Sequence, residues 1–252
     1  MTGPAIWVVV TCMGRLAHLK RSAPRLLCQA GVRYCLVDYS CPDAAGDWLS
    51  REFGGLIEAG HVVVERVPDQ RYFNKSAAQN AGARRALKEG AEYLCHLDAD
   101  TLVAPEFCAW LMGQVAPERF LIAALTADGR DEMSLTGVLV QPVGAFEASG
   151  GFDESFEGWG AEDIEYRLRL FLLCGYAYHE IPLGLLQAIA HDDELRGRWY
   201  REPDIKYTNR RHQHIVQHKV WRHWAGRWQN DYSSAKRLWF HAGGNAQPGF
   251  FR

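Results

Sequence analysis

The chain has 252 residues, 48% of them hydrophobic and 12% aromatic, so it is long and apolar enough to bury the core of one large domain. A formal net charge of −2 provides no overall attraction to nucleic acid or to an anionic membrane surface. No apolar run approaches the ~18 residues that a membrane span needs, and the N-terminus leads into an expected strand instead of a signal peptide. The seven cysteines are odd in number and lack CxxC spacing, which favours free thiols in a reducing compartment. We therefore expect a soluble, cytoplasmic protein.

The first hundred residues alternate short apolar runs with helical patterns. Strands are expected at 6–10, 34–37, 61–67 and 92–97, and helices at 18–30, 45–53 and 76–89. Continuous strands rich in Val, Ile and Leu, separated by helices, are typical of a mostly parallel sheet with helices on both faces. Ligands of such sheets bind beyond the carboxyl ends of the strands. The polar residues at those ends are Thr11, Arg15, Asp38, Asp98 and Asp100.

The second half of the chain is less regular. We expect strands at 120–126, 136–141, 176–181 and 185–190, a short helix at 142–149 and a longer one at 161–174. The polar segment between the first two of these strands has the composition of a mobile loop. The pattern thus indicates a main domain over 1–191.

Composition changes after His191. Residues 192–252 interleave basic side chains with tryptophans, and Pro203 and Asp204 can begin a helix that runs to about Trp224. A basic, aromatic tail can grip single-stranded nucleic acid by stacking and charge. Such a segment is more often a helical appendage that packs on its own domain or on a second subunit, and this is the interpretation we favour. A homodimer formed through the extension is one form of it.

Asp98-Ala99-Asp100 is the first candidate for chemistry. Residues two apart in an extended segment point to the same side, so both carboxylates can face one ligand. Oxygen ligands suit Mg²⁺ or Mn²⁺, which can bridge a diphosphate and stabilise it as it leaves. His191 ends another apolar run, and an imidazole ligand would favour Mn²⁺ over Mg²⁺. Its position alone fits an ordinary turn histidine better.

Glu162 and Asp163 open an amphipathic run directly after the glycine-rich loop around Trp159. Acidic residues in the first turn of a helix can simply complement the helix dipole. Two carboxylates beside a flexible aromatic loop also suit the binding and deprotonation of a hydroxylated substrate. On the other side of the expected site, Phe73 and Lys75 precede a helix, and Lys75 can pair with phosphate.

Other common motifs are missing. The chain contains no GxxxxGK[ST], GxSxG or HExxH, which argues against a P-loop site, the commonest serine hydrolases and the zincins. The carboxylate of Asp38 can accept a hydrogen bond from a base or ribose, although a strand-end Asp that begins a turn fits equally well.

Four segments together resemble the GT-A nucleotide-sugar glycosyltransferases, and more specifically the β-1,4-galactosyltransferase family and related bacterial chondroitin-polymerase-type domains. In chain order they are VVVTCMGRLAHLK at 8–20, FNKSAAQNAGARRAL at 73–87, HLDAD at 96–100 and the run LTGVLVQPVGAFEASGGFDESFEGWGAED at 135–163. The last segment carries the family's GFxxxxxGWGxED pattern, and His191 matches its late metal-binding histidine. Ala188 stands where the family has a methionine, and Ile164 replaces a third acidic residue.

The resemblance implies a GT-A, Rossmann-like catalytic domain at 1–191, with a nucleotide-binding half at 1–100 and an acceptor half at 101–191, in which residues 128–134 help to select the acceptor. It also implies an inverting, metal-dependent transfer of a hexose or N-acetylhexosamine from a UDP-sugar to an acceptor hydroxyl. It implies Asp163 as general base with Glu162 beside it, and Asp100, His191 and Asp98 as ligands of Mn²⁺, with Mg²⁺ as the alternative. The implied donor contacts are Thr11, Arg15, Asp38, Phe73, Lys75, Asp98 and Trp159. Two other functions stay open: a nucleotidyltransferase acting on a sugar phosphate, and a non-catalytic sugar-nucleotide or glycan-binding module.

Overall fold

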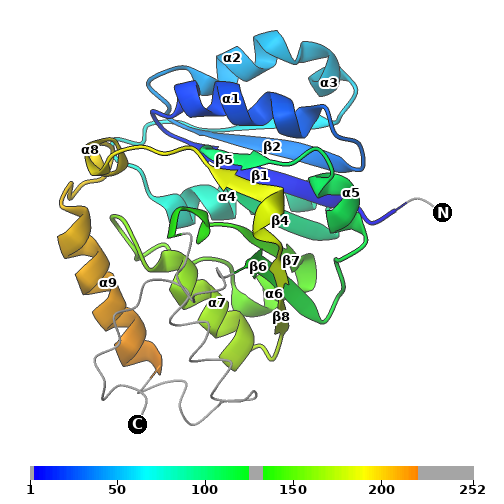
Figure 1. Cartoon of the computed structure of the whole chain (residues 1–252). Coiled ribbons are helices and arrows are strands. Elements are labelled where there is room, and N and C mark those ends of the chain that lie inside the picture. Colours follow the sequence, from blue (N-terminus) through cyan, green and yellow to red (C-terminus); the bar gives the residue numbers. More distant parts are fainter. Residues whose placement is uncertain (1–2, 125–132, 221–252) are drawn as a thin grey trace.

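Each of the first four strands is followed along the chain by a helical segment or a short further strand, and the second half of the chain is less regular (Figure 1). The computed structural model describes residues 3–124 and 133–220. The strands are β1 Ile6–Cys12, β2 Val32–Tyr39, β3 Val62–Val67, β4 Tyr93–Asp98, β5 Thr101–Val103, β6 Arg119–Ala123, β7 Leu139–Pro142, β8 Ala177–Ile181 and β9 Leu186–Ala188. The helices are α1 Leu16–Leu27, α2 Ala45–Glu52, α3 Gly54–Glu58, α4 Lys75–Lys88, α5 Phe107–Met112, α6 Val143–Ser149, α7 Glu162–Leu172, α8 Asp193–Gly197 and α9 Ile205–Lys219.

A seven-stranded sheet in the order β3-β2-β1-β4-β7-β6-β8 forms the centre of the fold. The strands β1 to β4 pair in parallel, whereas β7 runs antiparallel to both β4 and β6. The sheet is therefore mixed and mostly parallel, which confirms the predicted fold class.

Strand β1 shows why the sheet is covered on both faces. All seven of its residues are buried, and alternate side chains point to opposite faces. Val8 and Val10 pack with residues of α1 and α2, and Val9 packs with residues of α4. Gly82 of α4 lies so close to β1 that a Cβ there would come within 2.4 Å of the Val9 side chain, so this helix lies directly on the sheet.

A second, two-stranded sheet lies beyond the end of β4. Strand β5 pairs antiparallel with β9, with Thr101 opposite Ala188. The sequence predicts a strand at 185–190 and none at β5, because three residues are too few to show a period. This pairing matters for the site, since it folds the segment before His191 back against the Asp98–Asp100 turn.

Several boundaries differ from the expectations. Strand β6 ends at Ala123 and β7 begins at Leu139, so both are shorter than predicted at one end. The short helices α3, α5 and α8 were not predicted. Residues 125–132 of the expected mobile loop, and Trp221 with the rest of the tail, lie outside the described residues. No helix within the described ranges combines the length and the apolar character needed to cross a membrane.

Candidate active site

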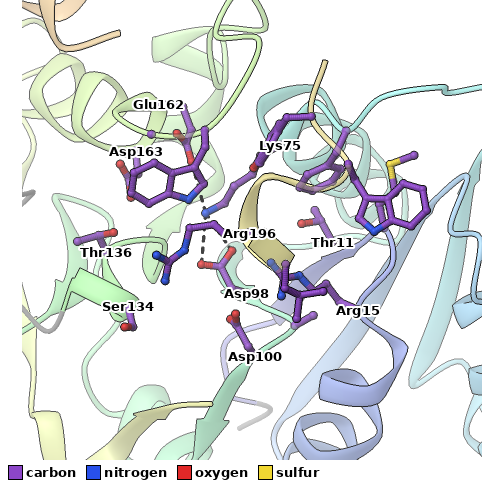
Figure 2. A pocket seen from close by; sticks show the side chains of 18 of the residues that line it. Thr11, Arg15, Lys75, Asp98, Asp100, Ser134, Thr136, Glu162, Asp163 and Arg196 are labelled. Carbon is purple, nitrogen blue, oxygen red and sulfur yellow. Dashed lines mark hydrogen bonds and ion pairs between the residues drawn. The ribbon is translucent and has the colours of Figure 1, made fainter. Parts of the chain in front are cut away.

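A cavity lies at the carboxyl ends of β1 and β4, where the N-terminus of α7 and the segment after β9 also meet (Figure 2). The register of the sheet explains why residues of β1 and β4 lie together in the cavity, because Thr11 of β1 lies directly opposite Asp98 of β4. The predicted residues that line the cavity are Thr11, Arg15, Phe73, Lys75, Asp98, Asp100, Trp159, Glu162, Asp163 and His191. Segments far apart in the sequence thus contribute to one site.

Asp100 and His191 lie closest together of the predicted metal ligands. His191 Nε2 is 2.7 Å from Asp100 Oδ2, and its Nδ1 is 3.1 Å from the carbonyl oxygen of Asp192. The β5–β9 pairing places them, since the Ile189 N–H donates to the Asp100 carbonyl at 2.8 Å. With its proton on Nε2 the ring donates a hydrogen bond to Asp100. With its proton on Nδ1 it donates to the Asp192 carbonyl instead, and Nε2 is then free to bind a cation together with the Asp100 carboxylate.

The donor set of this pair fits a divalent ion. Two ligands bound at ~2.1 Å and at right angles on one ion lie about 3 Å apart, which is near the separation observed here. A carbonyl that accepts the remaining N–H is also the usual second partner of a metal-bound histidine. Across residues 3–124 and 133–220, however, no group of three or more His, Cys, Asp or Glu side chains is arranged as a preformed metal site.

Asp98 differs from Asp100 because it pairs with Lys75. The Lys75 Nζ lies 2.9 Å from Asp98 Oδ1 and 3.5 Å from Glu162 Oε1 (Figure 2). Burial alone would lower the pKa of Lys75, but Asp98, Glu162 and Asp163 outweigh it and hold that pKa well above its usual value. Lys75 is therefore a fixed cation that joins the strand end of the cavity to the first turn of α7.

The acidic first turn of α7 follows a loop with unusual backbone angles. The φ angle is positive at three of its residues, 110° at Gly158, 99° at Gly160 and 64° at Ala161. Glycine adopts such angles without strain, whereas the Cβ of Ala161 makes its conformation less favourable. The turn they form places both following carboxylates on the cavity. Burial raises the pKa of Glu162 to about 7, although Lys75 opposes this, and its Oε2 has no hydrogen-bond partner. Asp163 is half-buried, and its Oδ1 accepts the N–H of Ile164 at 2.8 Å.

Asp38 is the one predicted site residue that does not line the cavity. Its Oδ1 accepts the N–H of Cys41 at 2.8 Å and its Oδ2 accepts the N–H of Gly46 at 2.9 Å. The buried carboxylate thus holds the turn after β2 against the start of α2. These contacts match the turn interpretation that the sequence left open, and the contact of Asp38 with the donor stays a prediction.

The described part of the C-terminal extension contributes residues that the sequence did not predict for the site. Arg196, Trp199, Tyr200 and Asn209 all line the cavity. The guanidinium of Arg196 lies 5.3 Å from the centre of the Trp159 ring, so it covers one face of that tryptophan. The Phe73 N–H donates to the Trp199 carbonyl at 2.8 Å, which ties the extension to the start of α4. No local sequence signal distinguishes these residues from other aromatic and basic positions in the extension.

Helix α9 also holds the loop before α7. Thr208 Oγ1 donates to the Trp159 carbonyl at 3.0 Å, and His212 Nδ1 is 2.7 Å from the Gly160 carbonyl oxygen. A guanidinium nitrogen of Arg211 donates to the Glu157 carbonyl at 2.8 Å. His212 is fully buried, and burial lowers its pKa, which favours the neutral ring. Within the described residues the extension is therefore part of the site's framework, in agreement with the preference for packing on the main domain.

The chain is similar to known proteins in its fold and in one segment of its sequence. A family model described as the N-terminal domain of galactosyltransferase matches residues 122–185, a segment that contains the GWGAED motif and ends before His191. A mannosyltransferase from Pyrobaculum calidifontis, solved with GDP-Man and Mn²⁺, superposes with a TM-score of 0.61 at 14% identity, covering 98% of this chain and 82% of that one. The fold is that of a GT-A glycosyltransferase.

Two solved structures of TarS from S. aureus have the same GT-A fold. The longer one matches with a TM-score of 0.63 at 9% identity, and this chain covers 42% of its length. TarS 1-349 in complex with UDP-GlcNAc matches with a TM-score of 0.56 at 10% identity, over 93% of this chain and 70% of that one. A comparison with curated protein sequences finds no significant match. Over its matched segment the chain resembles the galactosyltransferases, as the sequence predicts.

Proposed function

We propose that this protein is a glycosyltransferase that moves a sugar from a nucleotide sugar to an acceptor hydroxyl. One observation carries the proposal: two pairs of carboxylates, Asp98 with Asp100 and Glu162 with Asp163, line one cavity that also contains basic side chains. The GT-A fold, the match to the galactosyltransferase family model and the solved relatives with nucleotide sugars support it. The finer proposal is an inverting transfer of a hexose or N-acetylhexosamine from a UDP-sugar.

Asp100 and His191 would hold the divalent ion, for which we propose Mn²⁺, with Asp98 nearby. The ion would supply charge stabilisation to the departing diphosphate. Lys75 and Arg15 bring positive charge to the same end of the cavity, where phosphate oxygens can pair with them. Thr11 and Phe73, which also line this end, are proposed donor contacts.

On the other side, Asp163 would accept the proton of the acceptor hydroxyl as that oxygen attacks the anomeric carbon. It is half-buried and lines the cavity, whereas its neighbour Glu162 is buried and paired with Lys75. Asp163 lies in the first turn of α7, where the helix dipole favours negative charge. Trp159, with Arg196 on one face, would line the sugar or acceptor pocket.

The assignment of the base can be tested with Asp163→Asn. General-base help is worth about 10²–10⁴-fold, so turnover should fall by that factor while the donor still stabilises the protein in a thermal-shift assay. The matched control is Asp69→Asn, which changes an exposed aspartate at φ 63°, a conformation that Asn tolerates. Turnover near the wild-type rate in Asp163→Asn would refute the assignment. The product also decides the reaction class, since UDP marks glycosyl transfer and pyrophosphate marks nucleotidyl transfer.

The metal assignment can be tested with His191→Ala. We expect weaker Mn²⁺ binding, measured from the paramagnetic resonance signal of the free ion, together with a higher Mn²⁺ requirement for turnover. The control is His61→Ala, an exposed histidine ahead of β3. Unchanged Mn²⁺ binding and unchanged Mn²⁺ dependence in His191→Ala would refute a ligand role for this histidine.

A further inference from the structure

Two cysteines meet beside the cavity without lining it. Cys12 is the last residue of β1, and Cys41 lies in the turn after β2. The Sγ atoms are 3.7 Å apart, both side chains are buried, and both thiols are free. The parallel register places Cys12 opposite Asp38, and Asp38 Oδ1 accepts the Cys41 N–H, which turns the chain back toward β1.

The two thiols have opposite character. The hydrogen bond from Cys12 is the largest cause that lowers the pKa of Cys41, to about 6, and the N–H of Gly14, 3.2 Å from the Cys41 sulfur, lowers it further. The same hydrogen bond between the two thiols, together with burial, raises the pKa of Cys12 well above its usual value. Cys41 is therefore the nucleophile of the pair, and Cys12 is the neighbouring thiol placed to resolve an oxidised sulfur.

We propose that Cys12 and Cys41 form a reversible disulfide in the presence of a peroxide, and that this bond rearranges the turn at Gly14. In the first step the Cys41 thiolate attacks one peroxide oxygen, the O–O bond breaks, and Cys41 becomes a sulfenic acid while the other oxygen leaves as water after protonation. In the second step the Cys12 sulfur attacks the Cys41 sulfur. The S–O bond breaks, the Cys12 proton goes to the leaving hydroxide as water, and two thiols have been oxidised by one peroxide.

The geometry connects this bond to the cavity. A disulfide needs an S–S distance of about 2.05 Å, so the two sulfurs must approach each other by more than an ångström. The Cys41 sulfur also accepts a hydrogen bond from the Gly14 N–H, so its movement affects that turn. Gly14 has φ 69°, and a Cβ there would lie 1.8 Å from the Trp199 indole nitrogen, so the turn has little free space on that side. Met13 and Arg15, its neighbours, line the cavity. We therefore expect the oxidised protein to bind a nucleotide sugar more weakly, an expectation that rests on the proposed function.

The first test is independent of any catalytic activity. The intact protein is treated with increasing hydrogen peroxide, and its mass and tryptic peptides are measured without reduction. The expected result is a loss of two hydrogens and a cross-link between the peptide ending at Arg15 and the peptide Tyr34–Arg51, both reversed by dithiothreitol. Because Tyr34–Arg51 also contains Cys35, the variants Cys41→Ser and Cys35→Ala assign the bond: the first should abolish the cross-link and the second should keep it.

Two further measurements test the consequence. Hydrogen exchange at Gly14 should be faster in the oxidised protein, since its N–H partner has moved, and donor-induced thermal stabilisation should be smaller. Peroxide treatment that yields only sulfinic or sulfonic acids, or a cross-link that persists in Cys41→Ser, overturns the disulfide. An unchanged Gly14 exchange rate overturns the rearrangement. Equal donor binding by reduced and oxidised protein overturns the effect on the site. A reduced protein that binds no nucleotide sugar contradicts the proposed function, but it does not affect the disulfide or the change in Gly14 exchange.

Discussion

Glu162 allows a quantitative test of the electrostatics of the cavity without any substrate. Its side chain is 9% exposed, Oε2 has no hydrogen-bond partner, and Oε1 lies 3.5 Å from Lys75 Nζ. Burial raises its pKa from 4.5 to about 7. The folded state therefore binds this proton more tightly than the unfolded state, and the ionised form is destabilising. This destabilisation is absent below pH 4.5, grows as the pH rises toward 7, and is complete above that.

One pKa unit corresponds to about 1.4 kcal/mol, so the full effect is on the order of 3 kcal/mol. In Glu162→Gln the side chain is neutral at every pH. We therefore expect the variant to gain free energy of unfolding relative to the wild type, by up to about 3 kcal/mol, as the pH is raised from 4.5 to 8. Urea unfolding of both proteins without metal or nucleotide measures this difference. The control is Glu58→Gln, at an exposed position of α3. If the free energy of unfolding changes by the same amount in the wild type and in Glu162→Gln between pH 4.5 and pH 8, the buried carboxylate does not have the raised pKa.

Two further substitutions test how residues around the cavity support its shape. Gly137→Ala would place a Cβ 2.1 Å from Asp98 Oδ2 and 2.8 Å from Lys75 Nζ, so we expect a loss of about 1–3 kcal/mol in the free energy of unfolding and weaker donor binding. The control Gly144→Ala meets its nearest neighbour, Tyr176 Oη, at 3.7 Å and should change neither quantity by a comparable amount. Thr208→Val removes the hydrogen bond to the Trp159 carbonyl, which should cost about 1–3 kcal/mol and lower kcat more than it changes donor affinity. Thr208→Ser keeps the hydroxyl and should recover most of the free energy of unfolding and most of kcat. A Thr208→Val protein with wild-type kcat would show that α9 does not position the loop.

Much of the fold could be predicted because the relevant signals are local. The run Ile6–Val10 is continuously apolar, and all seven residues of β1 are buried in the sheet. Asn74 caps α4 by accepting the Ala77 N–H at 3.0 Å, and this helix begins one residue earlier than predicted. Short elements carry no such signal. Strand β5 has three residues, and its pairing with β9 depends on contacts between segments more than eighty residues apart.

The site was predictable where a motif or a strand end marked it, and not where packing decided it. The sequence placed Asp98 and Asp100 by their position after a strand, and the resemblance supplied His191, whose own neighbours suggested only a turn. Asp38 satisfied the same strand-end rule, yet its carboxylate is used by two backbone N–H groups in the next turn. Trp199 and Tyr200 reach the cavity because α8 and the segment after it fold back on β1 and α4, which no local pattern specifies.

The charges of the cavity limit what it can bind. Four carboxylates, those of Asp98, Asp100, Glu162 and Asp163, line it together with the cations of Arg15, Lys75 and Arg196. Lys75 is already within 4 Å of two of these carboxylates, so it cannot neutralise them and an incoming diphosphate at the same time. The carboxylates thus already balance the cations of the cavity, so the charge of an incoming diphosphate would stay uncompensated unless a further cation accompanied it. His191 Nε2 and Asp100 Oδ2, 2.7 Å apart, are the atoms of the cavity that we propose as ligands of that cation. The charge balance of the cavity therefore supports the proposed metal-dependent donor site.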